Sequence, residues 1–590
     1  MSLDIARTIA FSGLSAAQVQ ISVASANISN ADTTGYTEKT ANLSSNVTAG
    51  VGTGVTVTGI TSTVDKLLLK SLVGANSDLG AADTTNTYLS QLEDLYGSTS
   101  SSSSSSTGTS LANTIASFET ALSSLSSTPG SASLQSSAVS ALDDVASQLR
   151  ETSSSIQKLR GNADQDIASS VDTVNTDLQQ IASLNAEIKQ EAASGQSTAD
   201  LEDQRNTALQ DVASKMNVSY YTTSSGDLQV YTSSGQALVD SSAHTLSYTA
   251  AADVTASTTY SAGSSSGFSG ITVNGVDITS QITSGKIGAL VTLRDTTLPA
   301  AQSQLDQLAN KLSSSLNAVS NEGTSVPPPA SLTGTTTVSS STTLSASGTV
   351  RVAVADSSGN LVSYKDLDLS SYATVGDLVT ALNGISGVSA SIDSSGHLSI
   401  AATGSGDGIA INTMTSSVGS SGQGFSDYFG LNDLVTGTGA SDFAVRSDIL
   451  SGSAQLPTAT LDSSSTLTTG SSVLSSGSAT VVNALYDTLT TSTSFAAAGG
   501  LGATTGSFTD YAAAIVSNVA SKASQASSTY TAKETAQSTY ASSLSSESGV
   551  NLDEESARLS SLQNEYSAAS ELIQVVDSMF SSLVTAIQSG

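Results

Sequence analysis

The clearest hydrophobic pattern in the chain lies at its C-terminal end. After a first step of seven, apolar residues recur there at alternating steps of three and four: Leu552, Leu559, Leu562, Tyr566, Ala569, Ile573, Val576, Phe580, Leu583 and Ile587. This is the heptad spacing of a helix that packs its apolar seam against another helix. Asn551 can cap that helix, and the acidic residues 553–555 are favourable beside the positive end of its dipole. The pattern therefore predicts a terminal helix that begins near residue 552.

The N-terminal end carries a matching pattern. One apolar row contains Leu3, Ala10, Leu14, Ala17, Ile21, Ala24 and Ile28, and a second row beside it contains Ile5, Ile9, Ala16, Val19, Val23 and Ala26. A helix that is apolar over such a wide arc needs more than one neighbour. Chain ends are usually the least ordered parts of a domain, yet here they have the clearest seams.

We therefore expect the two end helices to pair with each other and then with other copies of the chain. The residues expected to carry this self-assembly are Leu14, Ala17, Ile21, Ala24 and Ile28 in the first helix, and Leu559, Leu562, Tyr566, Ile573, Val576, Phe580 and Leu583 in the last. The alternative is a closed bundle within one molecule, in which both helices serve only as core.

Between the ends, helical and β patterns alternate. Helices are predicted over about 63–96, 134–193, 198–216, 298–319 and 510–544, and a run of serines at 100–106 predicts a loop. Short alternating strands are predicted over 50–60, 218–240 and 332–461, and Asn274-Gly275 predicts a type I′ hairpin. Residues 375–400 have the pattern of a helix followed by a hairpin. The fold class is α+β, with helical coiled-coil inner layers formed by both termini and β-rich domains inserted in the middle.

Four domains follow from this layout. A terminal axial helical domain comprises residues 1–62 and 545–590. A helical coiled-coil domain comprises 63–217, 298–322 and 508–544. A β-rich inserted segment spans 218–297, and a β-rich outer domain spans 323–507.

Composition removes several classes of function. Of the 590 residues, 50 are acidic and 19 basic, so a net charge of −31 argues against nucleic acid and anionic membranes as partners. The chain has no cysteine, which excludes disulfides and cysteine-ligated metals. No run approaches the roughly 18 apolar residues of a membrane span, and the N-terminal segment lacks the basic region of a cleaved signal. We expect no membrane insertion and an extracellular protein exported without a cleaved signal peptide.

Candidate catalytic and binding motifs have plainer explanations. The glycines at 50–54 precede a strand instead of a helix, so they indicate a turn and not a phosphate-binding loop. The acidic pair 143–144 and the triplet 553–555 are interpreted as solvated helix acids. His244 and His397 lie far apart in the sequence. We therefore expect no enzyme activity, no cofactor and no metal.

Several short segments resemble a known family. Residues 12–18, 26–30 and 34–37, with Asn27, Asn30, Gly35 and Tyr36, resemble the N-terminal signature of bacterial flagellar rod, hook and hook-associated proteins. Segments 201–206, 285–295, 425–448 and 548–555 are similar to the hook-associated members of that family. Their motif residues are Asp203, Arg205, Gly285 and Gly288.

The resemblance implies a structural subunit that joins the flagellar hook to the filament. It further implies a homo-oligomeric ring in the flagellar axis, contacts with the hook protein, a second junction protein on the filament side, and an export chaperone on the C-terminal region. Two alternatives stay open: another axial protein, such as a hook or filament subunit, and a secreted adhesin-like module that binds through its β-rich middle.

Overall fold

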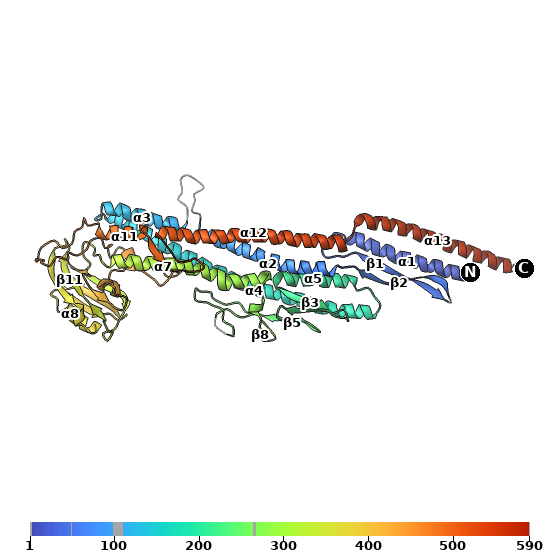
Figure 1. Cartoon of the computed structure of the whole chain (residues 1–590), viewed down its shortest axis with the longest axis horizontal. Helices are drawn as coiled ribbons and strands as arrows, with labels where there is room; N and C mark the ends of the chain where they lie inside the picture. Colours follow the sequence, from blue (N-terminus) through green and yellow to red (C-terminus); the bar gives the residue numbers. More distant parts are fainter. Residues whose placement is uncertain (1–2, 49, 98–109, 264–266, 589–590) are drawn as a thin grey trace.

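The molecule is elongated, with the two terminal helices at one end and β-rich structure at the other (Figure 1). The structure, a computed structural model, describes residues 3–48, 50–97, 110–263 and 267–588. The expected serine loop at 100–106 lies outside these residues. Helices occupy both termini and sheets occupy the middle, so the α+β fold class is confirmed.

One end of the molecule is formed by four elements, which we call the axial module. They are α1 (Leu3–Asn30), β1 (Lys39–Thr48), β2 (Val51–Ser62) and α13 (Leu552–Gln588). The strands form an antiparallel ribbon whose register runs from Lys39↔Ser62 to Thr48↔Val51. The predicted cap is present, because Asn551 Oδ1 accepts the N–H of Asp553 at 3.1 Å. The first strand was not predicted, since residues 39–48 lack regular alternation.

Long helices form the body of the molecule, which we call the rod. They are α2 (Lys66–Leu95), α3 (Leu111–Ser127), α4 (Ala132–Ala193), α5 (Ala199–Lys215), α6 (Gly285–Thr292), α7 (Leu298–Ser320), α11 (Thr480–Thr490) and α12 (Phe508–Ser548). In Figure 1, α2 and α12 run side by side along its length. The heptad positions of α4 are buried, among them Leu149, Ile156, Val174, Leu178 and Ile181, each completely so.

A β-rich insertion packs on the side of α4. It contains β3 (Val218–Thr222), β4 (Leu228–Thr232), β5 (Ala237–Val239), β6 (Leu246–Ser247), β7 (Thr272–Val273) and β8 (Val276–Asp277). Positive φ angles at Asn274 (51°) and Gly275 (78°) confirm the type I′ turn. Between α6 and α7 a single π-helical turn, η2 (Leu293–Thr297), buries Arg294. Its guanidinium binds Asp164 and Asp295, each at 2.8 Å, and lies over the Phe268 ring.

The outer end of the molecule has a separate hydrophobic core. It is built from β9 (Ser331–Thr337), β11 (Thr349–Asp356), β12 (Leu361–Asp368), α8 (Val375–Asn383), β13 (Val388–Ile392), β14 (His397–Ala402), β15 (Asp407–Asn412) and α9 (Phe425–Phe429). The strand orders are β12-β11-β15 and β13-β14-β9. The helix and hairpin expected at 375–400 are therefore present, as α8, β13 and β14.

The remainder of the stretch 323–507 is divided between the rod and a small third core. Buried apolar residues over 434–456 and 481–489 belong to the rod core, through β17 (Val435–Thr436), β18 (Ala444–Val445), α10 (Ser447–Leu450) and α11. The third core joins Leu361, Ala459 and Val473. Short elements complete the described chain: η1 (Thr279–Gln281), β10 (Ala346–Ser347), η3 (Leu369–Ser371), β16 (Ser417–Val418), β19 (Thr493–Phe495) and β20 (Thr504–Gly506).

Candidate assembly site

The two terminal helices pack against each other, and α13 reaches further than α1 (Figure 1). Within the contact, Ala17, Ala24, Leu562 and Val576 are buried. Outside this contact, apolar residues of α13 are exposed: Leu572, Val575, Met579, Phe580, Leu583, Val584 and Ile587. An exposed apolar face of this size marks a surface for another protein.

The seam residues identified from the sequence fall into three groups. Ala17, Ala24, Leu562 and Val576 lie in the contact between α1 and α13, and Leu14, Ile21, Ile28, Leu559 and Ile573 are half-buried at its margin. Tyr566, Phe580 and Leu583 are exposed. One copy therefore leaves part of the α13 seam uncovered.

Apolar side chains are also exposed on α1 and on the ribbon. Phe11 of α1 is 66% exposed, and the ribbon exposes Leu43, Val47 and Val51. The ribbon is held close to α1, because Ser12 Oγ accepts the N–H of Val55 at 3.1 Å. Gly54 makes this approach possible: its φ is +131°, and a Cβ there would lie 2.2 Å from Ser12 Oγ.

The first helix also meets the length and hydropathy of a membrane span. It is the one such helix among the residues that the structure describes, and 28% of its most apolar window is buried. In this structure α1 lies along α13 and carries the charged residues Asp4 and Arg7 near its start. Its apolar surface is thus partly covered by protein.

Behind the axial module, buried polar residues connect it to the rod. Asn27 of α1 is completely buried and makes four hydrogen bonds. Its Nδ2 donates to the Lys39 carbonyl (2.9 Å) and to Glu555 Oε2 (3.2 Å), and its Oδ1 accepts from Lys39 N (3.0 Å) and the Tyr36 hydroxyl (3.0 Å). One side chain therefore ties α1 to β1, α13 and the loop between α1 and β1.

Asp203 reaches the same place from α5 of the rod. Its carboxylate accepts from the Thr37 N–H (2.9 Å) and the Thr37 hydroxyl (2.8 Å), and it forms an ion pair with Lys39 Nζ. The Lys39 and Asp203 side chains are only 5% and 8% exposed. Gly35 lets the loop approach α5, because its φ is +79° and a Cβ there would lie 2.5 Å from Thr207 Oγ1.

The electrostatics of this place follow from burial among carboxylates. Burial, together with the charges of Asp200, Asp203 and Glu555, raises the pKa of Tyr36 to about 12. Tyr36 therefore stays a neutral donor at physiological pH, and its ring lies 4.2 Å from Lys39 Nζ. Burial also raises the pKa of Glu38, and the charge of Glu555 adds to that rise.

Further bonds occur where the chain itself crosses between module and rod. The Glu38 N–H donates to the Ser548 carbonyl (2.8 Å), and the Asp65 N–H donates to the Ser548 hydroxyl (3.3 Å). Arg558 of α13 lies 3.3 Å from Glu555 and 3.7 Å from Glu38. We call this set the joint: Asn27, residues 35–39, Asp203, Ser548, Glu555 and Arg558.

The family-motif residues divide between the joint and the rod. Asn27, Gly35, Tyr36 and Asp203 belong to the joint, and Asn30 closes the last turn of α1 by donating to the Ala26 carbonyl at 2.9 Å. The others lie within the rod. Arg205 donates to Asn185 Oδ1 (2.9 Å) and the Gly226 carbonyl (2.8 Å). Gly285 and Gly288 permit close backbone contacts, since a Cβ on either would lie within 3 Å of another backbone atom.

Sequence reasoning missed Thr37, Lys39, Ser548 and Glu555 as members of the joint. The interpretation of the acidic triplet 553–555 as solvated is wrong for Glu555, which is 1% exposed, although Asp553 and Glu554 are exposed. A signal was available, because Glu555 precedes Leu559 and Leu562 at the steps of four and three that define the seam.

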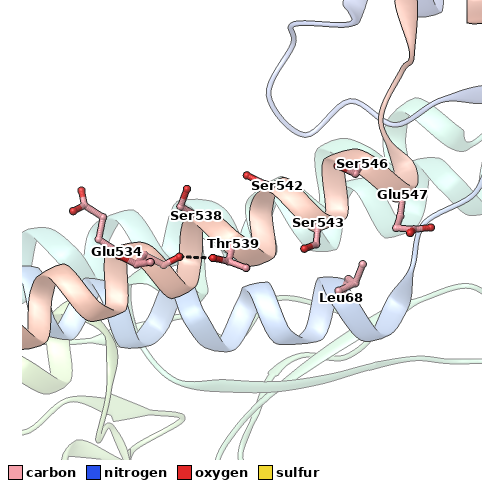
Figure 2. A pocket seen from close by; sticks show the side chains of 9 residues that line it. Leu68, Glu534, Ser538, Thr539, Ser542, Ser543, Ser546 and Glu547 are labelled. Atoms are coloured by element: carbon pink, nitrogen blue, oxygen red, sulfur yellow. Dashed lines mark hydrogen bonds between the residues drawn. The ribbon is translucent and has the colours of Figure 1, made fainter.

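Other hollows of the rod offer little chemistry. A groove of about 830 Å³ between α2 and α12 is lined by Leu68, Glu534, Glu547 and a row of serine and threonine hydroxyls (Figure 2). The two histidines lie elsewhere: His244 is 3.0 Å from Asp240 and His397 is 3.8 Å from Asp393. Within the described ranges, no cluster of three or more histidine, aspartate or glutamate side chains could hold a metal ion.

Four family models match successive parts of the chain. "Flagella basal body rod protein" matches residues 8–37, and "Flagellar basal body rod FlgEFG protein C-terminal" matches 541–586, so these two cover most of the paired terminal helices. "Flagellar hook-associated protein FlgK helical domain" matches 84–334, and "Flagellin hook IN motif" matches 333–404.

Two curated relatives have the same name. Flagellar hook-associated protein 1 of Salmonella typhimurium (strain LT2) is 26% identical over 324 residues, which are 53% of this chain and 56% of the relative. That of Escherichia coli (strain K12) is 26% identical over 317 residues, 52% and 55% of the two chains. The chain thus spans about half the length of the curated relatives it matches. The flagellar hook junction protein FlgK from Burkholderia pseudomallei gives a TM-score of 0.47 at 18% identity, over 80% of this chain and 98% of that one.

Paired terminal helices that match rod-protein models, joined to a match with a hook-associated helical domain, are features of flagellar axial proteins, and the chain is similar to this class of rod, hook and hook-associated proteins. Its location is therefore the extracellular flagellum. Within the class, both its longest domain match and its curated relatives are those of flagellar hook-associated protein 1.

Proposed function

We propose that the chain is a structural subunit of the flagellum that joins hook to filament. The observation that carries this proposal is the apolar surface of α13 that its contact with α1 leaves exposed. Roughly 25 cal/mol per Å² of apolar surface is gained when such a face is covered. Copies of the chain, stacked in a ring around the flagellar axis, would cover it.

In this proposal the axial module forms the inner layer and the rod and outer domain project from it. The seam residues of α1 and α13 carry the contacts between copies. The hook protein adjoins the ring on one side and a second junction protein on the filament side. The exposed C-terminal half of α13 also suits an export chaperone, which would cover it before assembly. Export then occurs without a cleaved signal peptide, and catalysis has no part in the function.

The proposal is tested by complementing a strain that lacks the chain. Phe580→Ser combined with Leu583→Ser changes two residues that are 54% and 49% exposed, so the isolated chain should keep its fold. We expect hooks that lose their filaments, because the apolar contact between copies is weakened. Gln574→Ser, an exposed polar position on the same helix, is the matched control and should restore motility. Filament retention with the double variant would contradict the proposal.

The same strain separates the alternatives. If the chain were a hook or filament subunit, its absence would remove that structure itself. If it were an adhesin, removal of the outer domain over 332–431, which has a core of its own, would abolish surface binding and leave filaments in place.

A further inference from the structure

The tip of the α4–α5 hairpin lies against the joint from the rod side. α4 ends at Ala193, Gly195 turns the chain with φ +71°, and α5 begins at Ala199. Asp203 lies one turn into α5, and its partners Thr37 and Lys39 are 166 and 164 residues away in the sequence. Asp203 thus bonds two parts of the molecule that are built from separate stretches of chain.

The buried positive charge of Lys39 is compensated by Asp203. The Lys39 side chain is 5% exposed, and its other donor contacts are the neutral Thr37 carbonyl (3.0 Å) and the Thr37 hydroxyl (3.1 Å). Asp200 lies 3.7 Å away, but its side chain is 76% exposed and its charge is therefore screened by water. Removing one partner of a buried pair leaves an uncompensated buried charge, which is strongly unfavourable. Without Asp203, Lys39 must reach water.

The other hydrogen bonds between module and rod are of two kinds. Ser197 Oγ, exposed at the tip of the hairpin, donates to the Ile60 carbonyl at 3.2 Å, close to the crossing at 62–66. The bonds of Ser548 to Glu38 and Asp65 lie beside the points where the chain crosses from rod to module, at 62–66 and 548–552. Because these bonds lie at the crossing points, the module could rotate relative to the rod about those points without breaking them. Asp203 is on α5, which has no covalent connection to the module at that point, so its bonds resist such rotation.

We propose that Asp203 is a positioning residue that fixes the tilt of the axial module relative to the rod, with Ser548 and Gly549 as the pivot. The tilt is set within one chain, before any copy is added, although the apolar faces of the module wait for neighbours. This inference concerns the single chain and stands independently of the proposed function. Its failure and the failure of that function are therefore distinguishable.

The tilt can be measured by the distance between two spin labels on the full chain. Because the chain has no cysteine, Gln18→Cys on α1 and Gln179→Cys on α4, both exposed, are labelled selectively. With Asp203→Asn, which keeps shape and removes charge, we expect the distance distribution to broaden at least twofold. Asp200→Asn removes the exposed acid beside the same lysine and should leave the distribution unchanged.

Lys39→Met removes the same ion pair from the other side and should broaden the distribution in the same way, which keeps the test valid if Asp203→Asn fails to fold. Unchanged hydrogen exchange along α4 shows that the rod is intact in each variant. The proposal would be overturned if Asp203→Asn and Lys39→Met both gave the same narrow distance distribution as the unaltered chain. Equal broadening in Asp200→Asn would overturn it too.

Discussion

Replacing Asn27 by alanine tests the joint directly. The side chain is completely buried, and its loss leaves the Lys39 N–H and carbonyl, the Tyr36 hydroxyl and one Glu555 oxygen without this partner. Each buried group left unsatisfied costs about 1–3 kcal/mol. Water entering the gap and the contact of Glu555 with Arg558 relieve part of that cost. We expect about 2–4 kcal/mol of local destabilisation, less than the sum of the separate penalties.

Hydrogen exchange is the appropriate assay, because a multidomain chain does not unfold in one step and has no single free energy of unfolding. A loss of about 2–4 kcal/mol accelerates amide exchange by roughly 30- to 1000-fold, at tenfold per 1.4 kcal/mol. The acceleration should be confined to the joint and the adjoining turns of α1 and α13. Asn30→Ala is the matched control, since Asn30 bonds only within its own helix end. Equal acceleration in both variants would refute the assigned role of Asn27.

Three further predictions concern burial, backbone and titration. Leu178→Ala removes a completely buried seam residue of α4 and should destabilise the rod by about 2–5 kcal/mol, whereas the exposed Gln179→Ala should not. Hydrogen exchange of the α4 amides compares the two variants, and equal exchange rates would contradict the packing. Gly35→Ala places a Cβ at a positive φ and against Thr207, so it should weaken the joint by about 1–2 kcal/mol or more. Gly13→Ala is the control, because its Cβ would lie in open space, and it should be neutral or slightly stabilising. Hydrogen exchange at the joint distinguishes the two variants. Because the pKa of Tyr36 is raised to about 12 from 10.0, its contribution to the stability of the joint is complete below pH 10 and is lost as pH rises toward 12. In an ultraviolet titration, the Tyr36→Phe variant should lack one late-titrating tyrosine that the unaltered chain shows. Identical curves for the two proteins would contradict the burial of Tyr36.

The elements that the sequence predicted are those whose signal is local and periodic. The seam of α4, the Asn551 cap and the Asn274-Gly275 turn each depend on residues within a few turns of one another. The helix α3 has the same kind of stripe, with Ile115, Phe118, Leu122 and Leu125 buried, but it directly follows a serine-rich stretch and was not predicted.

The joint could not be predicted in the same way. Its defining contacts are single polar pairs, such as Asn27 with Glu555, 528 residues apart, and they leave no period in the sequence. Resemblance pointed to Asn27, Gly35, Tyr36 and Asp203, yet it gave no reason for them to lie together. Lys39 and Glu555 were missed because a charged residue next to a turn or a helix start is usually solvated.

The return of the chain from the outer domain to the rod was missed for a related reason. Residues 434–489 contain two short strands and the short helices α10 and α11, separated by irregular chain. They belong to the rod core because the outer domain ends beside the rod and returns the chain to it, which no local pattern shows.

The proposed role of this chain is to hold the filament onto the hook. It is tested most directly by electron microscopy of a strain lacking the chain, together with an assay of filament protein in the medium. We expect intact hooks without filaments and filament protein shed as free subunits, with filaments restored by the unaltered chain. Normal filaments on the hooks of that strain would contradict it.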